Sequence, residues 1–311
     1  FFFKQKTAYE IKECDWSSDV CSSDLALDVI VHMNHDIHYG SDTPSTISMH
    51  GGGGAANTAT WLAELGHSVF FSCRMGDDAA GQAISREFDF WNIEYRKNFI
   101  ENEKTGIVVV LVDKTGERTM FPDSGANSGL SEKDLPNLAG FDAAFLSGYS
   151  LFNPRSTDGV LRMIQAIRQE GIPLFFDPAS VGTMSVFGRE RVLEFLPLMD
   201  AIIMNQSEAQ FISQSENLSE SMAFLTKLTP IVIIKMGSAG AIAQQRNNPE
   251  VDCPIEEIVP RDTTGAGDAF AAGFIPQWLA NGDLFDSMTA GNEIARRCVA
   301  IIGARPSVNP Q

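Results

Sequence analysis

The sequence predicts an α/β protein built on a mostly parallel sheet with helices on both faces. Short apolar runs of strand length alternate along most of the chain with longer amphipathic segments. Several runs are continuously apolar, as at residues 173–176 and 231–234, which is typical of strands buried on both faces. A β-rich part between residues 95 and 122 interrupts the alternation. These observations indicate three layers, α/β/α, with a smaller β-sheet attached.

The first 25 residues do not match the rest of the chain. They show neither helical nor strand periodicity, and they lack the apolar region and cleavage site of a signal peptide. Residues 1–25 resemble the translated sequencing-adapter leaders found at the ends of gene models. We therefore expect a non-native leader and assign residues 26–311 to the folded domain. Residues 26–31 then form the end of a first central strand whose start the leader has overwritten.

The next elements follow from their apolar spacing and turn residues. A polar, weakly alternating stretch at residues 40–50 indicates an exposed strand, and a glycine run then opens a small-residue helix that ends at Gly66. A strand and an amphipathic helix follow. Three β-rich segments come next, with the hairpin turn DKTG between the last two. The predicted ranges are 69–73 and 80–91 for the strand and helix, and 95–98, 105–112 and 118–122 for the β-rich segments.

Strands and helices alternate again in the second half of the chain. We predict strands at residues 141–147, 173–177, 201–204 and 231–235, and helices at 156–170 and 218–228. Ligands of parallel sheets bind at the carboxyl ends of the strands. Polar residues at these ends should therefore gather along one edge, and they are Asp28, Ser147, Asp177, Asn205 and Lys235.

Composition excludes some classes of partner. The formal net charge of −17 argues against nucleic acid and anionic membranes as partners, because both are polyanions. No apolar run approaches the roughly 18 residues that a membrane span requires. The five cysteines form no CxxC pair, so we expect reduced thiols in a cytoplasmic protein.

Residues 262–274 (DTTGAGDAFAAGF) carry the clearest chemical signal. Glycines without a Cβ let the loop turn tightly, and the small apolar residues that follow form a helix. The amide groups at such a helix start are unpaired donors aligned with a dipole that favours anions, which is suited to phosphate. Asp268 is an acid where an anion should bind. It is either a helix-cap residue or a general base that takes a proton from an attacking hydroxyl.

A second pattern favours the base. HGGGGAANTA at residues 50–59 leads into WLAELG at 61–66, and RMGDD follows at 74–78. These stretches resemble the N-terminal signature of the ribokinase-like (PfkB) family of carbohydrate and nucleoside kinases, and residues 262–274 resemble its C-terminal signature. The resemblance implies a three-layer α/β/α ribokinase-like domain with a small β-sheet lid, whose strands lie within about residues 35–50 and 94–122. Neither a GxGxxG dinucleotide motif after the first strand nor a P-loop is present.

The resemblance assigns the residues of catalysis and sugar binding. It implies Asp268 as the base and the amides of Gly265, Ala266 and Gly267 as the anion hole. In the family, an acid on the first strand holds sugar hydroxyls 29 or 30 residues before the asparagine of the glycine motif. Asp28 precedes Asn57 by 29 residues and is the candidate, with Gly52, Gly53 and Asn57 as further sugar contacts. The alternative for Asp28 is an exposed acid at a strand end.

The resemblance also implies nucleotide and metal sites. NQSE at residues 205–208 matches a motif whose acid, Glu208, organises Mg²⁺ through water. Asn205 and Glu208 also fit a helix capping box, and the two interpretations are compatible. The turn after residue 234 lies along the nucleotide in the family, through Lys235, Gly237 and Gly240. A monovalent cation, K⁺, which not all members use, would be held by Asp262, Thr264, Gly303 and Ser307.

The expected function is ATP-dependent phosphoryl transfer to a hydroxyl, expected to be primary, of a small sugar, with Mg²⁺ as cofactor. The alternatives are an adenosine-like nucleoside kinase and a catalytically silent sugar-binding relative. A homodimer through the lid is expected from the family. Arg118 is expected to form a cross-strand ion pair inside the lid, the alternative being that it reaches into the site.

Overall fold

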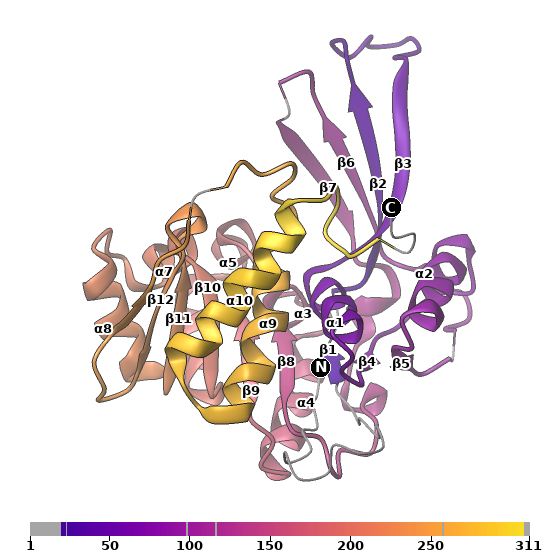
Figure 1. Cartoon of the computed structure of the whole chain (residues 1–311). Helices are drawn as coiled ribbons and strands as arrows, with labels where there is room; N and C mark the ends of the chain where they lie inside the picture. Colours follow the sequence, from indigo (N-terminus) through magenta and orange to yellow (C-terminus); the bar gives the residue numbers. More distant parts are fainter. Residues whose placement is uncertain (1–19, 23, 98, 116, 257, 308–311) are drawn as a thin grey trace.

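The structure is a computed structural model that describes residues 20–22, 24–97, 99–115, 117–256 and 258–307. A nine-stranded sheet forms the centre, and a four-stranded sheet rises from one end of it (Figure 1). The large sheet has the order β13-β12-β11-β10-β9-β8-β1-β4-β5. It is parallel from β5 to β11 and antiparallel at β12 and β13, which confirms the prediction of a mostly parallel sheet.

The strands of the large sheet are β1 Val20–Ser22, β4 Phe70–Ser72, β5 Glu94–Tyr95, β8 Ala144–Ser147, β9 Leu174–Asp177, β10 Ala201–Asn205, β11 Ile231–Lys235, β12 Ala241–Gln245 and β13 Val251–Cys253. The helices are α1 Gly54–Glu64, α2 Ala79–Phe90, α3 Gly148–Leu151, α4 Thr157–Gln169, α5 Val181–Phe187, α6 Arg189–Phe195, α7 Gln206–Ser213, α8 Leu218–Leu228, α9 Ala266–Asn281 and α10 Leu284–Val299. The predicted elements at residues 156–170, 173–177, 218–228 and 231–235 are confirmed, with bounds within one residue.

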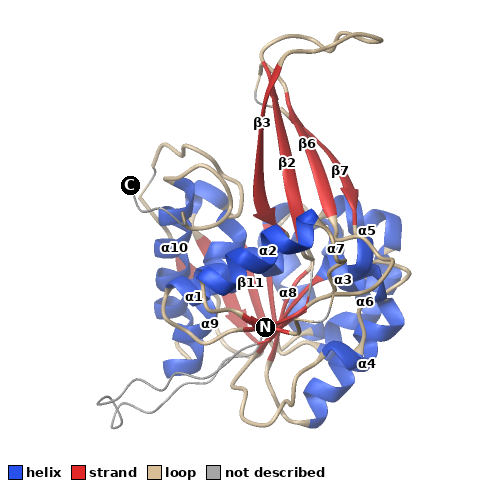
Figure 2. Ribbon diagram, turned by 90° about the vertical axis from the view of Figure 1, so that its right-hand side faces the viewer, coloured by secondary structure: helices blue, strands red, loops and turns tan. Residues whose placement is uncertain are grey.

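Helices cover both faces of the large sheet, as Figure 2 shows. Alternate residues of one strand belong to different cores: Phe175 lies in the core that also contains residues of α1, α2, α9 and α10, whereas Phe176 lies in the core that contains residues of α4 to α8. Because both faces are buried, these strands contain almost no polar residue before their carboxyl ends. No helix among the described residues is long and apolar enough to cross a membrane.

The structure corrects the exclusion of residues 1–25 from the fold. Val20–Ser22 is β1, which lies in the middle of the large sheet between β4 and β8 and is parallel to both. Leu25 is buried in the core beside α1. A strand is needed between β4 and β8 to pair their backbone groups, and these last residues of the expected leader take that place. Residues 1–19 lie outside the described residues.

The small sheet, which we call the lid, also differs from the prediction in two places. Its order is β3-β2-β6-β7, with β2 Ala26–Met33, β3 Ser45–Gly52, β6 Ile107–Val112 and β7 Arg118–Asp123. The predicted first central strand at residues 26–31 is therefore a lid strand, which pairs along its full length with β3. Its apolar residues resemble a buried strand because one face of the lid is also apolar.

The second difference concerns the β-rich segment at residues 95–98, which was predicted in the lid. Its first residue belongs to β5 at the edge of the large sheet, where Tyr95 pairs with Phe71. The Tyr95 ring is buried and packs edge-on against Phe88 of α2. This burial against α2 holds the segment on the large sheet and away from the lid.

Candidate active site

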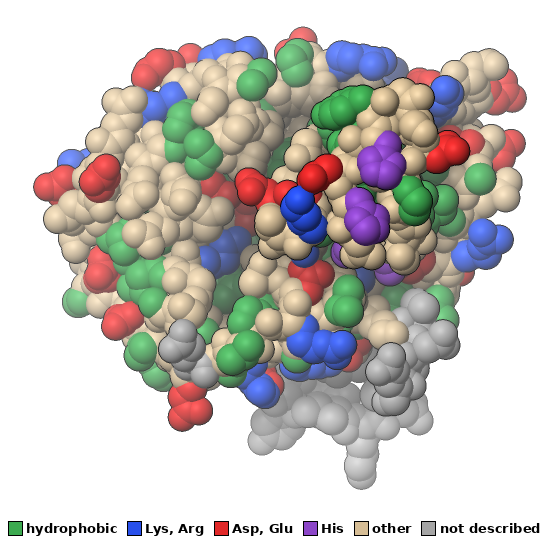
Figure 3. Space-filling view, turned by 90° about the horizontal axis from the view of Figure 1, so that it is seen from above, with side chains coloured by type: hydrophobic (Ala, Val, Ile, Leu, Met, Phe, Trp, Pro, Cys, Tyr) green, Lys and Arg blue, Asp and Glu red, His purple; other side chains and the backbone are tan. Residues whose placement is uncertain are grey.

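A cavity of about 160 Å³ opens at the carboxyl ends of the parallel strands, below the lid. Four of the five polar residues predicted at this edge line it: Ser147, Asp177, Asn205 and Lys235. Asp28 is the exception, because it lies on lid strand β2. Seen from above, the surface is hollowed between the lid and the main body (Figure 3). The other lining residues are Gly54, Phe145, Tyr149, Ala179, Glu208, Gly267 and Asp268.

The predicted anion loop opens α9 as expected. Gly265 has φ +76° and is the cap residue of the helix, and a Cβ there would meet Ala304. The first N–H groups of α9 have no acceptor inside the helix, and the Ala266 N–H makes only a long hydrogen bond of 3.4 Å to the Thr263 carbonyl in the preceding loop. Lys235 reaches this loop from β11, since its Nζ lies 2.8 Å from the point that a Cβ on Gly267 would occupy. The loop therefore combines amide donors, a helix dipole and an ammonium group, all of which favour an anion.

Asp268 lies in the first turn of α9 and faces the cavity. Asn57 of α1 donates a hydrogen bond of 2.9 Å from its Nδ2 to Asp268 Oδ2. Burial raises the pKa of the Asp268 carboxyl to about 8; the Asn57 hydrogen bond opposes this, and the carboxylates of Asp177 and Asp24 add to it. The ionised carboxylate of a group with such a pKa is a stronger base than that of an ordinary aspartate, and its share of the population grows as the pH rises towards 8.

Asp24 is a site residue that the sequence reading missed. Its carboxylate accepts hydrogen bonds from the backbone N–H groups of Gly54 (2.7 Å) and Ala55 (2.8 Å) at the start of α1. Burial raises the pKa of Asp24 to about 6, although these hydrogen bonds oppose the shift. A Cβ placed on Gly54 would lie 3.1 Å from Asp268 Oδ1 and 3.5 Å from Asp24 Oδ2, so the two carboxyl groups are neighbours. Asp24 belongs to the segment that the sequence assigns to the leader, so the sequence alone does not place it in the site.

The pH dependence of turnover should report Asp268. Because only the ionised carboxylate accepts a proton, we expect kcat/KM with neither substrate saturating to fall about tenfold per pH unit below an inflection near 8. Asp24→Asn removes one of the charges that raise the Asp268 pKa, so the inflection should move to lower pH. The measurement is a pH series of initial rates for both proteins. The same inflection in the variant would contradict this coupling.

The predicted sugar contacts meet where the lid joins the main body. Asp28 lies directly over Gly52, so closely that a Cβ on Gly52 would overlap its carboxyl group. Gly53 is the cap residue of α1, and Asn57 lies one turn further along that helix. Burial raises the pKa of Asp28 to about 6, and the nearby Arg305 opposes the shift. Because Gly52 has no Cβ, the Asp28 carboxyl can lie against it, and a carboxylate at this junction can accept hydrogen bonds from hydroxyl groups of a ligand.

Arg305 is a second residue that the sequence reading missed. Its buried guanidinium donates from Nε to Asn57 Oδ1 (2.9 Å) and from Nη2 to the Gly52 carbonyl (2.7 Å), and its Nη1 pairs with Glu87 of α2 (3.0 Å). Because Asn57 Oδ1 accepts from Arg305, its amide group is left to donate to Asp268. Arg305 thus orients the residue that holds the candidate base.

Of the four predicted nucleotide residues, Asn205 and Lys235 line the cavity, whereas Gly237 and Gly240 are not among its lining residues. Asn205 and Glu208 form the predicted capping box at the start of α7, so this interpretation is confirmed. Glu208 is buried; burial and Asp177 raise its pKa to about 7, whereas Lys235 opposes the shift. Lys235 Nζ pairs with Asp177 Oδ2 at 2.9 Å. Burial alone would lower the pKa of Lys235, but the carboxylates of Asp177 and Glu208 hold it above its usual value. Gly237 and Gly240 bracket the turn between β11 and β12.

Three of the four residues predicted to hold K⁺ meet before α9. Asp262 Oδ1 accepts from the Thr264 N–H (2.9 Å) and hydroxyl (2.6 Å), and Oδ2 accepts from the Gly303 N–H (3.0 Å). Ser307 follows two residues after Arg305 at the end of the described chain. Arg118 of β7 also pairs with Asp262 (2.8 Å). The expected cross-strand ion pair inside the lid is therefore wrong. The alternative, in which Arg118 reaches out of the lid towards the site, is closer to the observed contact. Protein donors therefore occupy both oxygens of the Asp262 carboxylate, and this arrangement does not fit a bound cation.

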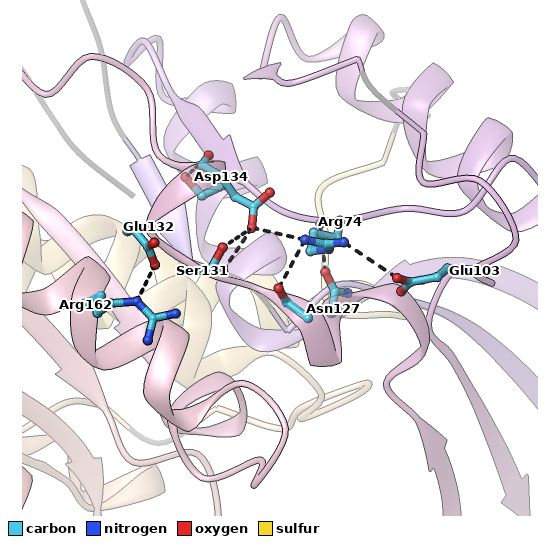
Figure 4. Close-up of polar contacts among 9 residues, drawn as sticks. Arg74, Glu103, Asn127, Ser131, Glu132, Asp134 and Arg162 are labelled. Carbon is cyan, nitrogen blue, oxygen red and sulfur yellow. Dashed lines mark hydrogen bonds and ion pairs between the residues drawn. The ribbon is translucent and has the colours of Figure 1, made fainter.

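Arg74 of the RMGDD stretch supports the site from a distance (Figure 4). The Arg74 N–H donates to Asn127 Oδ1 (3.0 Å), and its guanidinium lies 3.6 Å from Glu103 and 3.8 Å from Asp134. Asn127 in turn donates to the Leu25 carbonyl (2.7 Å). This network fixes the segment between β1 and β2 that carries Asp24.

This chain is similar in sequence and in structure to known proteins. A family model described as pfkB family carbohydrate kinase matches residues 18–311. A fructokinase of Klebsiella pneumoniae is 29% identical over 260 residues, covering 80% of this chain and 84% of that protein. Among solved structures, adenosine kinase from Sinorhizobium meliloti has a TM-score of 0.81 at 21% identity, covering 94% of this chain and 96% of that one. Arabidopsis thaliana ribokinase complexed with ribose and ATP has a TM-score of 0.77 at 24% identity, covering 92% and 93%.

Proposed function

Because the chain belongs to the pfkB family of carbohydrate kinases, we propose that it transfers the γ-phosphoryl group of ATP to a hydroxyl, expected to be primary, of a small sugar. The observation that carries the proposal is the position of Asp268. Asn57 Nδ2 donates a hydrogen bond of 2.9 Å to Asp268 Oδ2. Asp268 lies in the first turn of α9, directly after Gly267, and the Lys235 ammonium lies beside Gly267. A proton acceptor and an anion-binding loop are thus adjacent.

The chemistry follows from this adjacency. The acceptor oxygen attacks the γ-phosphorus, the bond from phosphorus to the bridging oxygen of ADP breaks, and the hydroxyl proton passes to Asp268. The amides of Gly265, Ala266 and Gly267 and the Lys235 ammonium stabilise the charge on the transferring phosphoryl oxygens. There is little covalent work for the protein, so orientation and electrostatics supply the rate.

The charges of the cavity fit a nucleotide bound with Mg²⁺. Of the charged residues that line it, three are acidic and one, Lys235, is basic, so a bare triphosphate would be repelled. Both Glu208 oxygens already accept hydrogen bonds from Asn205, which suits contact with Mg²⁺ through water. Asn205, Lys235, Gly237 and Gly240 would lie along the nucleotide. When bound, Mg²⁺ neutralises phosphate charge.

A sugar acceptor is better supported than a nucleoside. Asp28 and Asn57 supply a carboxylate and an amide at the lid junction, and such polar groups suit a polyol. The fructokinase likeness extends over most of both chains. The adenosine kinase likeness, at 21% identity, supports the fold alone. The nucleoside kinase and the catalytically silent sugar-binding relative remain the alternatives that a test must separate.

The test is ADP release by the full-length chain with ATP, Mg²⁺ and a panel of D-ribose, D-fructose, 2-keto-3-deoxygluconate and adenosine. We expect turnover with one of the three sugar acceptors and a far higher KM for adenosine. Preference for adenosine would establish the nucleoside kinase. A sugar that raises the melting temperature without any ADP release would establish the silent relative. Cys73, Cys253 and Cys298 are buried free thiols in the part of the chain that the structure describes, and they suit the cytoplasm, where we place this ATP-dependent reaction.

We also propose a homodimer formed through the lid. Strand pairing puts Val29, Met49, Val109 and Phe121 in one row on a single face, opposite to that of Asp28. Met49 is 64% and Phe121 55% exposed, and a contiguous apolar patch on a soluble protein usually marks an interface. A second copy would cover this face without blocking the site.

Two lid methionines test the dimer, because they are similarly exposed on opposite faces. Met49→Lys places a charge on the apolar face and should give monomers. Met120→Lys, on the face that carries Asp28, should leave the dimer intact. Light scattering after size-exclusion chromatography measures both masses. A monomeric wild type, or a dimeric Met49→Lys, would contradict the proposal.

A further inference from the structure

Arg118 connects the lid to the loop before α9. It is the first residue of lid strand β7, and its guanidinium contacts the loop before α9. Its Nη2 donates to Asp262 Oδ1 at 2.8 Å, and its Nη1 donates to the Thr264 hydroxyl. Both terminal nitrogens of the planar guanidinium therefore donate hydrogen bonds to the loop that leads directly into Gly265, the cap residue of α9.

The carboxylate that Arg118 contacts is saturated by donors. Three donors converge on Asp262 Oδ1, two of them from Thr264, and the Gly303 N–H occupies Oδ2. The Thr264 carbonyl accepts from the Cys298 thiol at 3.4 Å. Hydrogen bonds from Thr264, Arg118 and Gly303 therefore occupy both oxygens of the carboxylate. Its compensating charge comes from Arg118.

A cation site of the kind expected for K⁺ needs carboxylate or carbonyl oxygens that point into a common space. Here Gly303 presents its N–H to Asp262, and the Thr264 carbonyl faces a thiol. The position beside Asp262 Oδ1, where a cation would gain most, is taken by a guanidinium. The side chain of Asp262 is only 11% exposed, so this pair is screened less than a surface ion pair.

We propose that Arg118 is the built-in cation of the anion loop: it neutralises Asp262 and fixes residues 262–265, so that turnover needs no monovalent cation. The inference rests on the proposed kinase activity. Arg118 acts through the loop and touches no reacting atom, so it is a positioning residue. Without the Arg118 charge, the uncompensated Asp262 carboxylate would lie beside a loop that must bind phosphate oxygens. The loop would also lose the two hydrogen bonds that Arg118 donates to it. The contact between Arg118 and Asp262 also connects the lid to the loop at residues 262–265.

The test is the dependence of kcat on K⁺, with saturating substrates and with tetramethylammonium replacing K⁺ at constant ionic strength. The wild type should show the same kcat with either cation. Arg118→Met should lose roughly tenfold or more in tetramethylammonium, as expected for loss of a charge-assisted hydrogen bond, and should regain activity with K⁺, which can then reach Asp262. Arg118→Lys keeps the charge and should stay independent of K⁺.

Lys114→Met is the matched control, because Lys114 makes an exposed lid ion pair with Asp36. It should resemble the wild type. Strong activation of the wild type by K⁺ would overturn the inference without any variant, and so would an Arg118→Met enzyme with normal kcat in both cations. If Arg118→Met does not fold, the wild-type titration still decides. Absence of turnover with every acceptor would instead refute the proposed function, so the two failures are distinguishable.

Discussion

Asp268→Asn should reduce kcat by at least about 100-fold, because removal of a positioned general base typically costs 10²–10⁴-fold. The variant keeps the shape of the side chain and the anion loop, so KM for ATP should change little. Steady-state kinetics with the acceptor that the panel identifies measure both constants. Turnover near the wild-type value would refute the role of Asp268 as the base.

The stability of this variant separates loss of chemistry from loss of fold. The folded pKa of Asp268, about 8, is above the unfolded value of 3.8. The protonated form therefore stabilises the fold below pH 4, and this contribution is lost as the pH rises through 8. Asparagine cannot ionise, so at pH 9 the variant should melt no lower than the wild type. A lower melting temperature there would show that the substitution disturbs the structure.

Gly265→Ala should reduce kcat by about 100-fold or more, because loss of even one oxyanion-type donor costs 10²–10³-fold. Gly265 has φ +76°, which disfavours an L side chain, and its Cβ would press on Ala304. Either the loop or the 303–305 segment must move, and the amides of Ala266 and Gly267 move with the loop. The measurement is kcat together with the melting temperature.

Gly282→Ala is the matched control at the other end of the same helix. Gly282 also has a positive φ, +67°, but no atom lies near the position of its Cβ. It should cost about 1 kcal/mol of folding free energy and leave kcat unchanged. Equal loss of kcat in both variants would attribute the effect to helix stability and contradict the anion-hole role of Gly265.

The sequence predicted those parts of the fold and the site that local patterns encode. Strands such as Ile231–Lys235 are apolar on both faces, so their burial is visible in the sequence. Asp268, Asn205 and Glu208 stand in short motifs whose geometry follows from a helix start, and the structure brings them to one cavity. The Asp262 loop and the glycines before α1 were located in the same way.

Residues whose roles depend on distant contacts were not predictable. Arg305 meets Asn57 across 248 positions of sequence, and Arg118 meets Asp262 across 144. No periodicity or spacing encodes such pairs. Asp24 and β1 were missed for another reason, because their surroundings look foreign while the backbone pairing of the sheet still requires a strand there. The strand at Ala26–Met33 was misplaced because an apolar lid face and a buried central strand have similar composition.

The most direct test of phosphoryl transfer at this site measures both products in one sample. Full-length protein is incubated with ATP, Mg²⁺ and each acceptor, and ADP and phosphorylated acceptor are quantified together by chromatography and mass spectrometry. We predict equal amounts of the two products with the preferred sugar, and a loss of both in Asp268→Asn. ADP formed without phosphorylated acceptor, or a bound sugar with neither product, would contradict the account.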